Sequence, residues 1–372
     1  MNEIKKYKFC DLYDMASGIS STKGQAGHGA PFLSFGTVFN NYFLPENLID
    51  KMDTTIEEQN TFSIKKGDVF VTRTSETIDE LAMSSVALKD YPNATYSGFV
   101  KRLRPKTTGI VYDKFLAFYL RSKLFRKTMT NNATMTLRAS FNEDIFSFLY
   151  LYLPPYEEQK KIGDLLYNIE MKMLANKKIN DNLEQQAYLI FENMMAKAEA
   201  HRLKGKYTEA KFLASVITGK EDANFSVPNG KYKFFTCSNK PLYCNSYAFH
   251  TSSILIAGNG DFNVKHYSGK FNAYQRTYVL TPKKEYFALL YFASLYRINS
   301  FKSSSSGSIV KFITKSDVEN IPVFIPDDTA YLDELNKLLL AQEQNTLENE
   351  LLVQLRDWLL PMLMNGQATI SD

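Results

Sequence analysis

The feature of this sequence that most restricts its fold is an internal repeat. Strand-like segments, helix-like segments and prolines of the first half recur in the same order in the second half. The matched landmarks are residues 69–71 with 254–256, Pro105 with Pro282, Phe115 with Phe287, and Pro155 with Pro326. The spacing between partners shrinks steadily along the chain, as expected when surface loops differ in length between copies. The repeat therefore predicts one folded unit used twice, in a pseudo-twofold arrangement.

Each half ends in a long helix-like segment, from about 157 to 200 and from about 329 to 360. If Ile162 occupies position a of a heptad, the next a positions are Ile169, Asn176, Leu183 and Ile190. One Asn in such a seam fixes register at some cost in stability. The second seam is polar midway and resumes at Leu351, Leu355 and Trp358. Two such seams predict an antiparallel helix pair, although each stripe alone is also typical of a simple core face.

The segments before the helices are rich in strand signals. Short runs of β-favouring residues begin after Gly or Ser turns or end at Pro, and short helices rich in Tyr and Phe follow them. The expected fold class is α+β: two strand-rich α/β domains separated by two long helices that pack as an antiparallel coiled coil. The expected domains are 1–152 and 206–326, and the expected helical spacers are 153–205 and 327–372.

Charge is unevenly distributed behind a formal net charge of +4. Residues 206–326 contain 15 Lys and Arg against 7 Asp and Glu, whereas residues 327–372 contain 2 against 9. This asymmetry is typical of a polyanionic ligand on one part and a protein contact on another. The three cysteines form no CxxC pair, and neither a secretory signal nor a membrane-spanning run is present, so a reducing cytoplasm is the expected location.

Features that could indicate catalysis have better structural explanations. Pro154-Pro155-Tyr156 is close to the (N/D)PPY motif of amino-methyltransferases, but Leu153 stands where that motif needs a polar side chain. The glycines of 257–262 follow a strand, but the residues after them do not form the crossover helix of a nucleotide-binding loop. The four histidines lack HxxxH spacing. The sequence therefore predicts no catalytic residue, no metal site and no cofactor.

Binding chemistry is better represented, at the ends of predicted strands. The candidates for DNA contact are Arg73, Thr74, Ser75, Lys101 and Arg102 in the first domain, and Asn259, Lys265, His266, Lys270 and Arg276 in the second. Arg and Lys suit guanine edges and phosphates, Asn suits adenine, and Ser and Thr suit either base type. Each residue alone also fits a solvated polar loop. As a set that includes a basic domain, they predict contact with nucleic acid.

Two stretches resemble a known family. LPPYEEQKKIGDLLYNIEMKM at 153–173 resembles a conserved signature of type I restriction–modification specificity (S) subunits, and LRDWLLPMLMNGQATI at 355–370 resembles that family's C-terminal signature. The layout is similar over essentially the whole chain. The resemblance implies a double-stranded DNA partner, with two target-recognition domains that each read one half of a bipartite site and paired helices that set the gap between the halves. It also implies that methyl donor and ATP bind to partner subunits and not to this chain.

The resemblance further implies protein partners. The helical regions would hold two methyltransferase (modification) subunits, and the assembly would recruit restriction subunits. The helix residues expected to contact partners are Ile162, Ile169, Leu183, Ile190, Leu351, Leu355 and Trp358. IPDDTAYLDELNKL at 325–338 departs from the family's Glu-Glu-Gln pattern, which weakens the expected symmetry of docking. Two alternatives remain: an adenine methyltransferase with its own recognition domain, and a coiled-coil adaptor whose domains bind protein.

Overall fold

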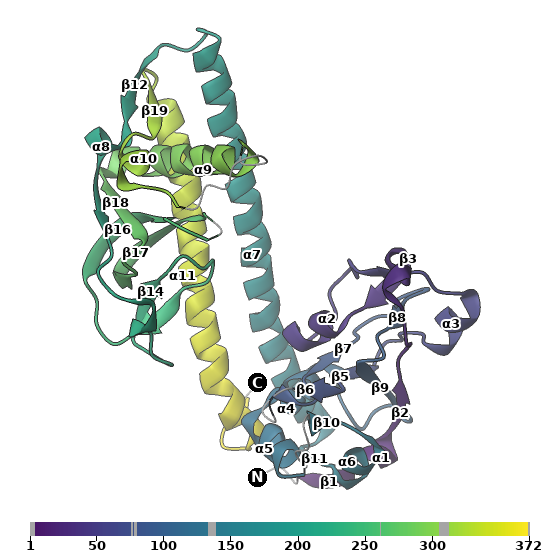
Figure 1. Ribbon diagram of the computed structural model, residues 1–372. Helices are drawn as coiled ribbons and strands as arrows, with labels where there is room; N and C mark the ends of the chain where they lie inside the picture. The colour runs from purple at the N-terminus through teal and green to yellow at the C-terminus, as the bar shows by residue number, and fades with distance from the viewer. Residues whose placement is uncertain are drawn as a thin grey trace. The chain divides into compact units, whose positions relative to one another are not determined.

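The computed structural model describes residues 4–75, 77, 80–132, 139–260, 262–304 and 312–370. The chain forms two compact units, the first made of Met1–Leu174 with Asn349–Asp372 and the second of Ala175–Glu348. Each unit contains one strand-rich domain and a portion of two long helices, α7 (Tyr156–Glu199) and α11 (Ala330–Met364), shown in teal and yellow in Figure 1. No helix among the described residues is long and apolar enough to cross a membrane.

The domain of the first unit mixes short strands and short helices. Its strands are β1 (Lys5–Lys8), β2 (Tyr13–Ser17), β3 (Ala26–Leu33), β4 (Lys51–Met52), β5 (Val69–Thr72), β6 (Thr74–Ser75), β7 (Ser84–Val86), β8 (Thr95–Tyr96), β9 (Val100–Pro105), β10 (Ala139–Ser140) and β11 (Tyr150–Leu153). Its helices are α1 (Phe9–Leu12), α2 (Phe35–Asn40), α3 (Ile56–Thr61), α4 (Asp113–Arg121), α5 (Lys123–Asn132) and α6 (Glu143–Phe148). The largest sheet is antiparallel, in the order β2-β9-β5-β7, and smaller sheets pair β4-β3-β8, β1-β11 and β10-β6.

The uninterrupted apolar run of β5 is explained by burial on both faces of the sheet. Val69 and Val71 belong to the main core of the unit, whereas Phe70 belongs to a second cluster on the opposite face. Successive side chains of a strand alternate between faces, so a strand covered on both sides has no solvent position for a polar residue.

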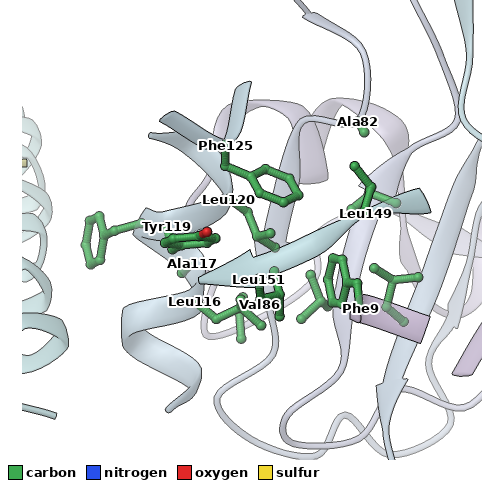
Figure 2. Close-up of a cluster of buried hydrophobic side chains, with 14 of the residues drawn as sticks. Phe9, Ala82, Val86, Leu116, Ala117, Tyr119, Leu120, Phe125, Leu149 and Leu151 are labelled. Atoms are coloured by element: carbon green, nitrogen blue, oxygen red, sulfur yellow. The ribbon is translucent and has the colours of Figure 1, made fainter. Parts of the chain in front are cut away.

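The main core of the first unit joins α4, α5 and β11 to one face of the β2-β9-β5-β7 sheet. In Figure 2 the Tyr119 and Phe125 rings and Leu120 lie beside Leu151 of β11, and Leu149, which precedes the strand, lies in the same cluster. Tyr119 Oη accepts a hydrogen bond from the Tyr152 N–H at 3.0 Å, and burial of the hydroxyl raises its pKa. The aromatic content of the helix-like segment at 112–125 is therefore core, and each fully buried large side chain contributes about 2 kcal/mol.

The second unit is built around one larger sheet. Its strands are β12 (Gly205–Glu209), β13 (Ala214–Thr218), β14 (Tyr232–Phe235), β15 (Leu242–Cys244), β16 (Phe249–Ala257), β17 (Val264–Ala273), β18 (Thr277–Pro282) and β19 (Pro322–Pro326), and its short helices are α8 (Ala210–Leu213), α9 (Phe287–Ser304) and α10 (Lys315–Glu319). The six-stranded sheet has the order β13-β18-β16-β17-β14-β15, and only the β14–β17 pair is parallel. Helix α9 packs against β16 and β17 (Figure 1).

The strand pairing confirms the tandem repeat. β1 pairs with β11 as β12 pairs with β19, and the order β2-β9-β5 recurs as β13-β18-β16. The register agrees as well, because Tyr13 lies opposite Pro105 and Ala214 lies opposite Pro282. The predicted fold class is therefore confirmed: two α/β domains with two long helices.

Polar contacts between α7 and α11 show that the helices pack antiparallel. In the first unit, Arg356 donates to Glu170 (3.2 Å) and Asn349 donates to the Met173 carbonyl (3.1 Å). Within the second unit, the pairs are Asn176 with Glu348 (2.6 Å), Asn180 with the Gln342 carbonyl (3.1 Å), and Lys197 with Tyr331 (3.2 Å). Residue numbers rise along one helix as they fall along the other. The predicted antiparallel pairing is confirmed, and Asn176 is buried in the seam as its heptad position predicts.

Candidate nucleic-acid interface

The two domains share a tight turn that leads into the strand at the centre of the repeat. In the first unit, the Val100 N–H donates to Ser97 O (2.9 Å) and the Gly98 N–H to Ile19 O (2.7 Å). In the second unit, the Thr277 N–H donates to Tyr274 O (2.8 Å) and the Gln275 N–H to Glu221 O (2.9 Å). The backbone of 97–100 is therefore repeated by 274–277.

A second loop binds this turn in the same way in both copies. The Arg73 N–H donates to Phe99 O, and the Gly258 N–H donates to Arg276 O, each at 2.8 Å. The carbonyls of Arg73 and Gly258 accept in turn from Phe141 (2.7 Å) and Ile313 (2.8 Å). We call these paired segments the tip loops: 73–75 with 97–100 in the first unit, and 258–260 with 274–277 in the second.

The first-unit tip loops hold part of the set predicted to bind DNA. Arg73 is exposed, whereas Thr74 and Ser75 are half-buried because β6 pairs with β10. Phe99, which the sequence reading did not single out, is 65% exposed beside Arg73. A cation and an exposed aromatic ring thus share one loop pair, a combination that suits phosphate and base contacts.

Lys101 and Arg102 are corrections to the predicted set. Lys101 is buried, and its Nζ donates to Ser17 Oγ (2.8 Å) and Glu143 Oε1 (3.1 Å). The pKa of Glu143 is lowered by a bond from its own backbone N–H, then by Lys101 and Arg73. Arg102 donates from Nη1 to Ser63 O (2.8 Å). Both cations are committed to contacts inside the domain, so the structure does not support them as DNA-facing groups.

In the second unit, three of the five predicted residues lie at or beside the tip loops. Asn259 follows β16 in a turn, and Arg276 is exposed at the third position of the 274–277 turn. Lys265 lies close to Arg276 through the segment 236–237. The Lys265 Nζ donates to Thr236 O (3.2 Å), and the thiol of Cys237, which follows Thr236, donates to Arg276 O (3.5 Å). Burial lowers the pKa of Lys265 to about 8.

His266 and Lys270 lie elsewhere. Neighbouring side chains of a strand point to opposite faces, so His266 cannot share the direction of Lys265. His266 Nδ1 lies 3.2 Å from Glu343 Oε1 on α11, and its ring packs edge-on against Tyr291. Lys270 is exposed and lies over the Tyr247 ring at 4.9 Å. His266 is a correction, because it contacts a helix inside its own unit.

The predicted partner-binding residues also divide into two groups. Ile162 and Ile169 are buried, Ile162 in the core of the first unit, and Leu183 and Ile190 are half-buried. Ile162 and Ile169 are therefore corrections, because they offer a partner no surface. Leu351, Leu355 and Trp358 are exposed and recur at i, i+4 and i+7, so they form one apolar stripe on α11.

The Gln of the motif at 153–173 has a structural role. Gln159 is buried; its Nε2 donates to Ile110 O (3.0 Å) and Pro154 O (2.9 Å), and its Oε1 accepts from the Tyr112 N–H (3.0 Å). It thus fastens the start of α7 to the loop before α4. Neighbouring Leu153 is buried in β11, opposite Lys5, so the Pro-Pro-Tyr segment leads into a helix and does not grip a base.

In the second unit, a side chain of α11 also binds the backbone near a helix start. Asn336 on α11 accepts from the Ala288 N–H (3.2 Å) and donates to Glu285 O (2.9 Å). Residues 327–329 depart from the Glu-Glu-Gln pattern, and Asn336 joins α11 to the start of α9 from a position about two turns beyond the start of α11.

The second unit also contains a groove of about 810 Å³ between the sheet, the start of α9, and α11. Glu285, Asp333 and Glu343 line it beside Lys284 and Lys337, so it lacks the positive excess expected of a DNA site. Among the described residues, no group of three or more His, Cys, Asp or Glu side chains could hold a metal ion.

Duplicated domains, each with the same loop pair and joined by paired helices, define a protein of two similar modules on one helical scaffold. The sequence matches the family described as type I restriction modification DNA specificity domain over residues 4–185 and 195–352. These matches cover most of the chain, so the chain belongs to this family. The family is defined by DNA specificity and not by a catalytic domain, in agreement with the sequence reading.

Individual relatives agree with this assignment. The type I restriction enzyme EcoDI specificity subunit of Escherichia coli is 40% identical over 172 residues, a match that covers 44% of this chain but only 38% of that protein. The fold is similar to the type I restriction–modification S subunit from M. genitalium, with a TM-score of 0.63 at 15% identity over 97% of this chain and 96% of that one.

Proposed function

We propose that this chain is the DNA specificity subunit of a cytoplasmic type I restriction–modification complex. Residues 1–152 and 206–326 would each read one half of a bipartite DNA site, and the helical regions 153–205 and 327–372 would form the scaffold. The observation that carries the proposal is the repetition of the tip loops in both domains, each with an exposed arginine. Arg73 supplies it in the first domain, and Arg276 in the second.

The chemistry of the tip loops suits base recognition. An arginine can bind guanine O6 and N7 with two hydrogen bonds, and Asn259 can bind adenine in the same manner. The excess of 15 Lys and Arg over 7 Asp and Glu across 206–326 attracts and positions the phosphate backbone, which fixes register without reading sequence. Lys270, away from the tip loops, fits this second role.

The apolar stripe Leu351, Leu355 and Trp358 is the proposed docking surface for a methyltransferase subunit. Exposed apolar residues on one helix face are a feature of protein interfaces, and tryptophan is enriched among residues that dominate binding energy. The tandem repeat is consistent with two methyltransferase copies. Restriction subunits would join the same assembly, while methyl donor and ATP would bind to partners.

The proposal is tested by reconstituting the full chain with the methyltransferase of the same system and measuring binding to duplex libraries. We expect selection of a bipartite motif whose halves are separated by a fixed number of unspecified base pairs. Affinity should fall steeply with salt because counterions are released from the duplex. A complex that assembles fully but selects no motif would contradict the proposal, and binding of methyl donor by the isolated chain would favour the methyltransferase alternative.

A further inference from the structure

The third residue of the repeated turn is Phe99 in the first domain and Arg276 in the second. We propose that this residue enters a groove of the DNA in each half-site, so that at this position of the turn the first domain makes an apolar contact and the second domain makes hydrogen bonds. This inference rests on the proposed function and deepens it. Phe99 would contact the apolar surface of base pairs, either a thymine methyl group or an opened base step.

The backbone around Phe99 is fixed, which leaves its ring as the variable part of the turn. The Phe99 N–H donates to Ser97 Oγ (3.2 Å), and its carbonyl accepts from Arg73 (2.8 Å). The ring is 65% exposed although a phenylalanine is normally buried. A rigid turn that presents an apolar ring loses little conformational entropy when that ring is buried against a ligand.

The arginine lies in the first tip-loop segment of the first domain (Arg73) but in the second segment of the second domain (Arg276). Packing at Gly258 explains this difference. A Cβ atom at Gly258 would lie 2.7 Å from the Arg276 carbonyl oxygen and 3.0 Å from the Tyr278 ring. The second domain therefore has no room for a side chain at the position that Arg73 occupies in the first. Its cation comes instead from Arg276, at the position of Phe99, with Gln275 exposed beside it.

The experiment compares base preference in the reconstituted complex of the full chain with its methyltransferase. Phe99→Ala should relax preference at one or two adjacent positions of one half-site and weaken binding to the preferred site about 10-fold. Arg276→Ala should act on the other half-site only. Phe148→Ala is the matched control, because Phe148 is 67% exposed in the same unit, at the far end of α6 from the tip loops, and should change nothing.

A second arm identifies the apolar contact. Replacing single thymines of the affected half-site by deoxyuridine removes only the methyl group. If Phe99 contacts that methyl, one replacement should weaken the wild type and leave Phe99→Ala unaffected. If the ring opens a base step, a mismatch at that step should strengthen wild-type binding and not binding of the variant.

Two outcomes would overturn the inference while the proposed function stands. In the first, Phe99→Ala selects the wild-type motif with wild-type affinity. In the second, Phe99→Ala and Arg276→Ala alter the same half-site. Thermal unfolding of each variant confirms that it is folded, and Phe99→Leu, which keeps an apolar group, should retain part of the preference. By contrast, a wild-type complex that selects no motif would remove the proposed function itself.

Discussion

Asn176 on α7 donates a 2.6 Å hydrogen bond to Glu348 on α11, and both residues belong to the second unit. The Asn is buried in the helix seam, and the bond lies beside a second polar contact of the seam, from Asn180 to the Gln342 carbonyl. If α11 were shifted along α7, Asn176 would face a different residue and lose this hydrogen bond. The pair therefore helps to fix the register of the two helices.

Asn176→Ala should lower the free energy of unfolding by about 2 kcal/mol, because it leaves Glu348 without this hydrogen bond in the seam. Thermal or urea unfolding of the full chain measures the change. Lys177→Ala, one residue away and exposed, serves as the control and should be near neutral. Equal stability of the two variants would show that the Asn176–Glu348 bond does not stabilise the pair.

Gln159→Ala should destabilise the first unit by roughly 3 kcal/mol, because the Tyr112 N–H and the Ile110 carbonyl lose their buried partner together. Hydrogen exchange at the start of α4 should rise along with the loss of stability. Gln185→Ala provides the comparison, since Gln185 is exposed on the same helix and should have no effect. Unchanged exchange near α4 would argue against the fastening role.

If Lys265 contacts DNA as proposed, binding should depend on pH. Its pKa of about 8 means that it loses its charge between about pH 7 and 9, so affinity should fall over this range. Lys265→Arg, which stays charged, should remove this part of the pH dependence, and Lys265→Met should also flatten the salt dependence. The folded state binds this proton more weakly than the unfolded state, so the free energy of unfolding should rise as the pH increases from about 8 towards 10.5, the ordinary pKa of a lysine. A pH profile that Lys265→Arg leaves unchanged would exclude this residue from the interface.

Trp358→Glu should weaken association with the methyltransferase subunit about 10-fold or more without changing the stability of the free chain, because the side chain is exposed. Size-exclusion chromatography with light scattering measures the assembly. Trp358 is also the only tryptophan, so the difference in fluorescence between wild-type and Trp358→Phe complexes should report its burial directly. Leu189→Glu, at an exposed position on α7, is the control. Loss of assembly in both variants would point to a general helix effect.

Much of the fold followed from the sequence because its signals are periodic. The apolar stripes predicted α7 and α11, and the matched prolines Pro105 and Pro282 predicted strand ends that share one register. The apolar stripe of a helix does not reveal which other part of the chain packs against it. Ile162 belongs to the same stripe as half-buried Leu183, yet Ile162 packs into the core of the first unit. Which stripe residues are buried in this way depends on contacts between residues distant in sequence, and the stripe alone does not predict them.

The candidate interface was harder to predict for the same reason. Lys101 and Arg102 carry the right charge, but Glu143 and Ser63, which bind them, lie about 40 residues away along the chain. Phe99 carried no polar signal and was missed. Matching the strands that follow the two turns would have paired Phe99 with Arg276, and so identified it from the repeat alone.

The pairing of β1 with β11, and of β12 with β19, has an evolutionary consequence. In each domain the first and last strands pair, so the two ends of the segment between them lie side by side. If the domains read DNA as proposed, exchange of that segment alone would change the recognised sequence and leave the helices that form the scaffold unchanged.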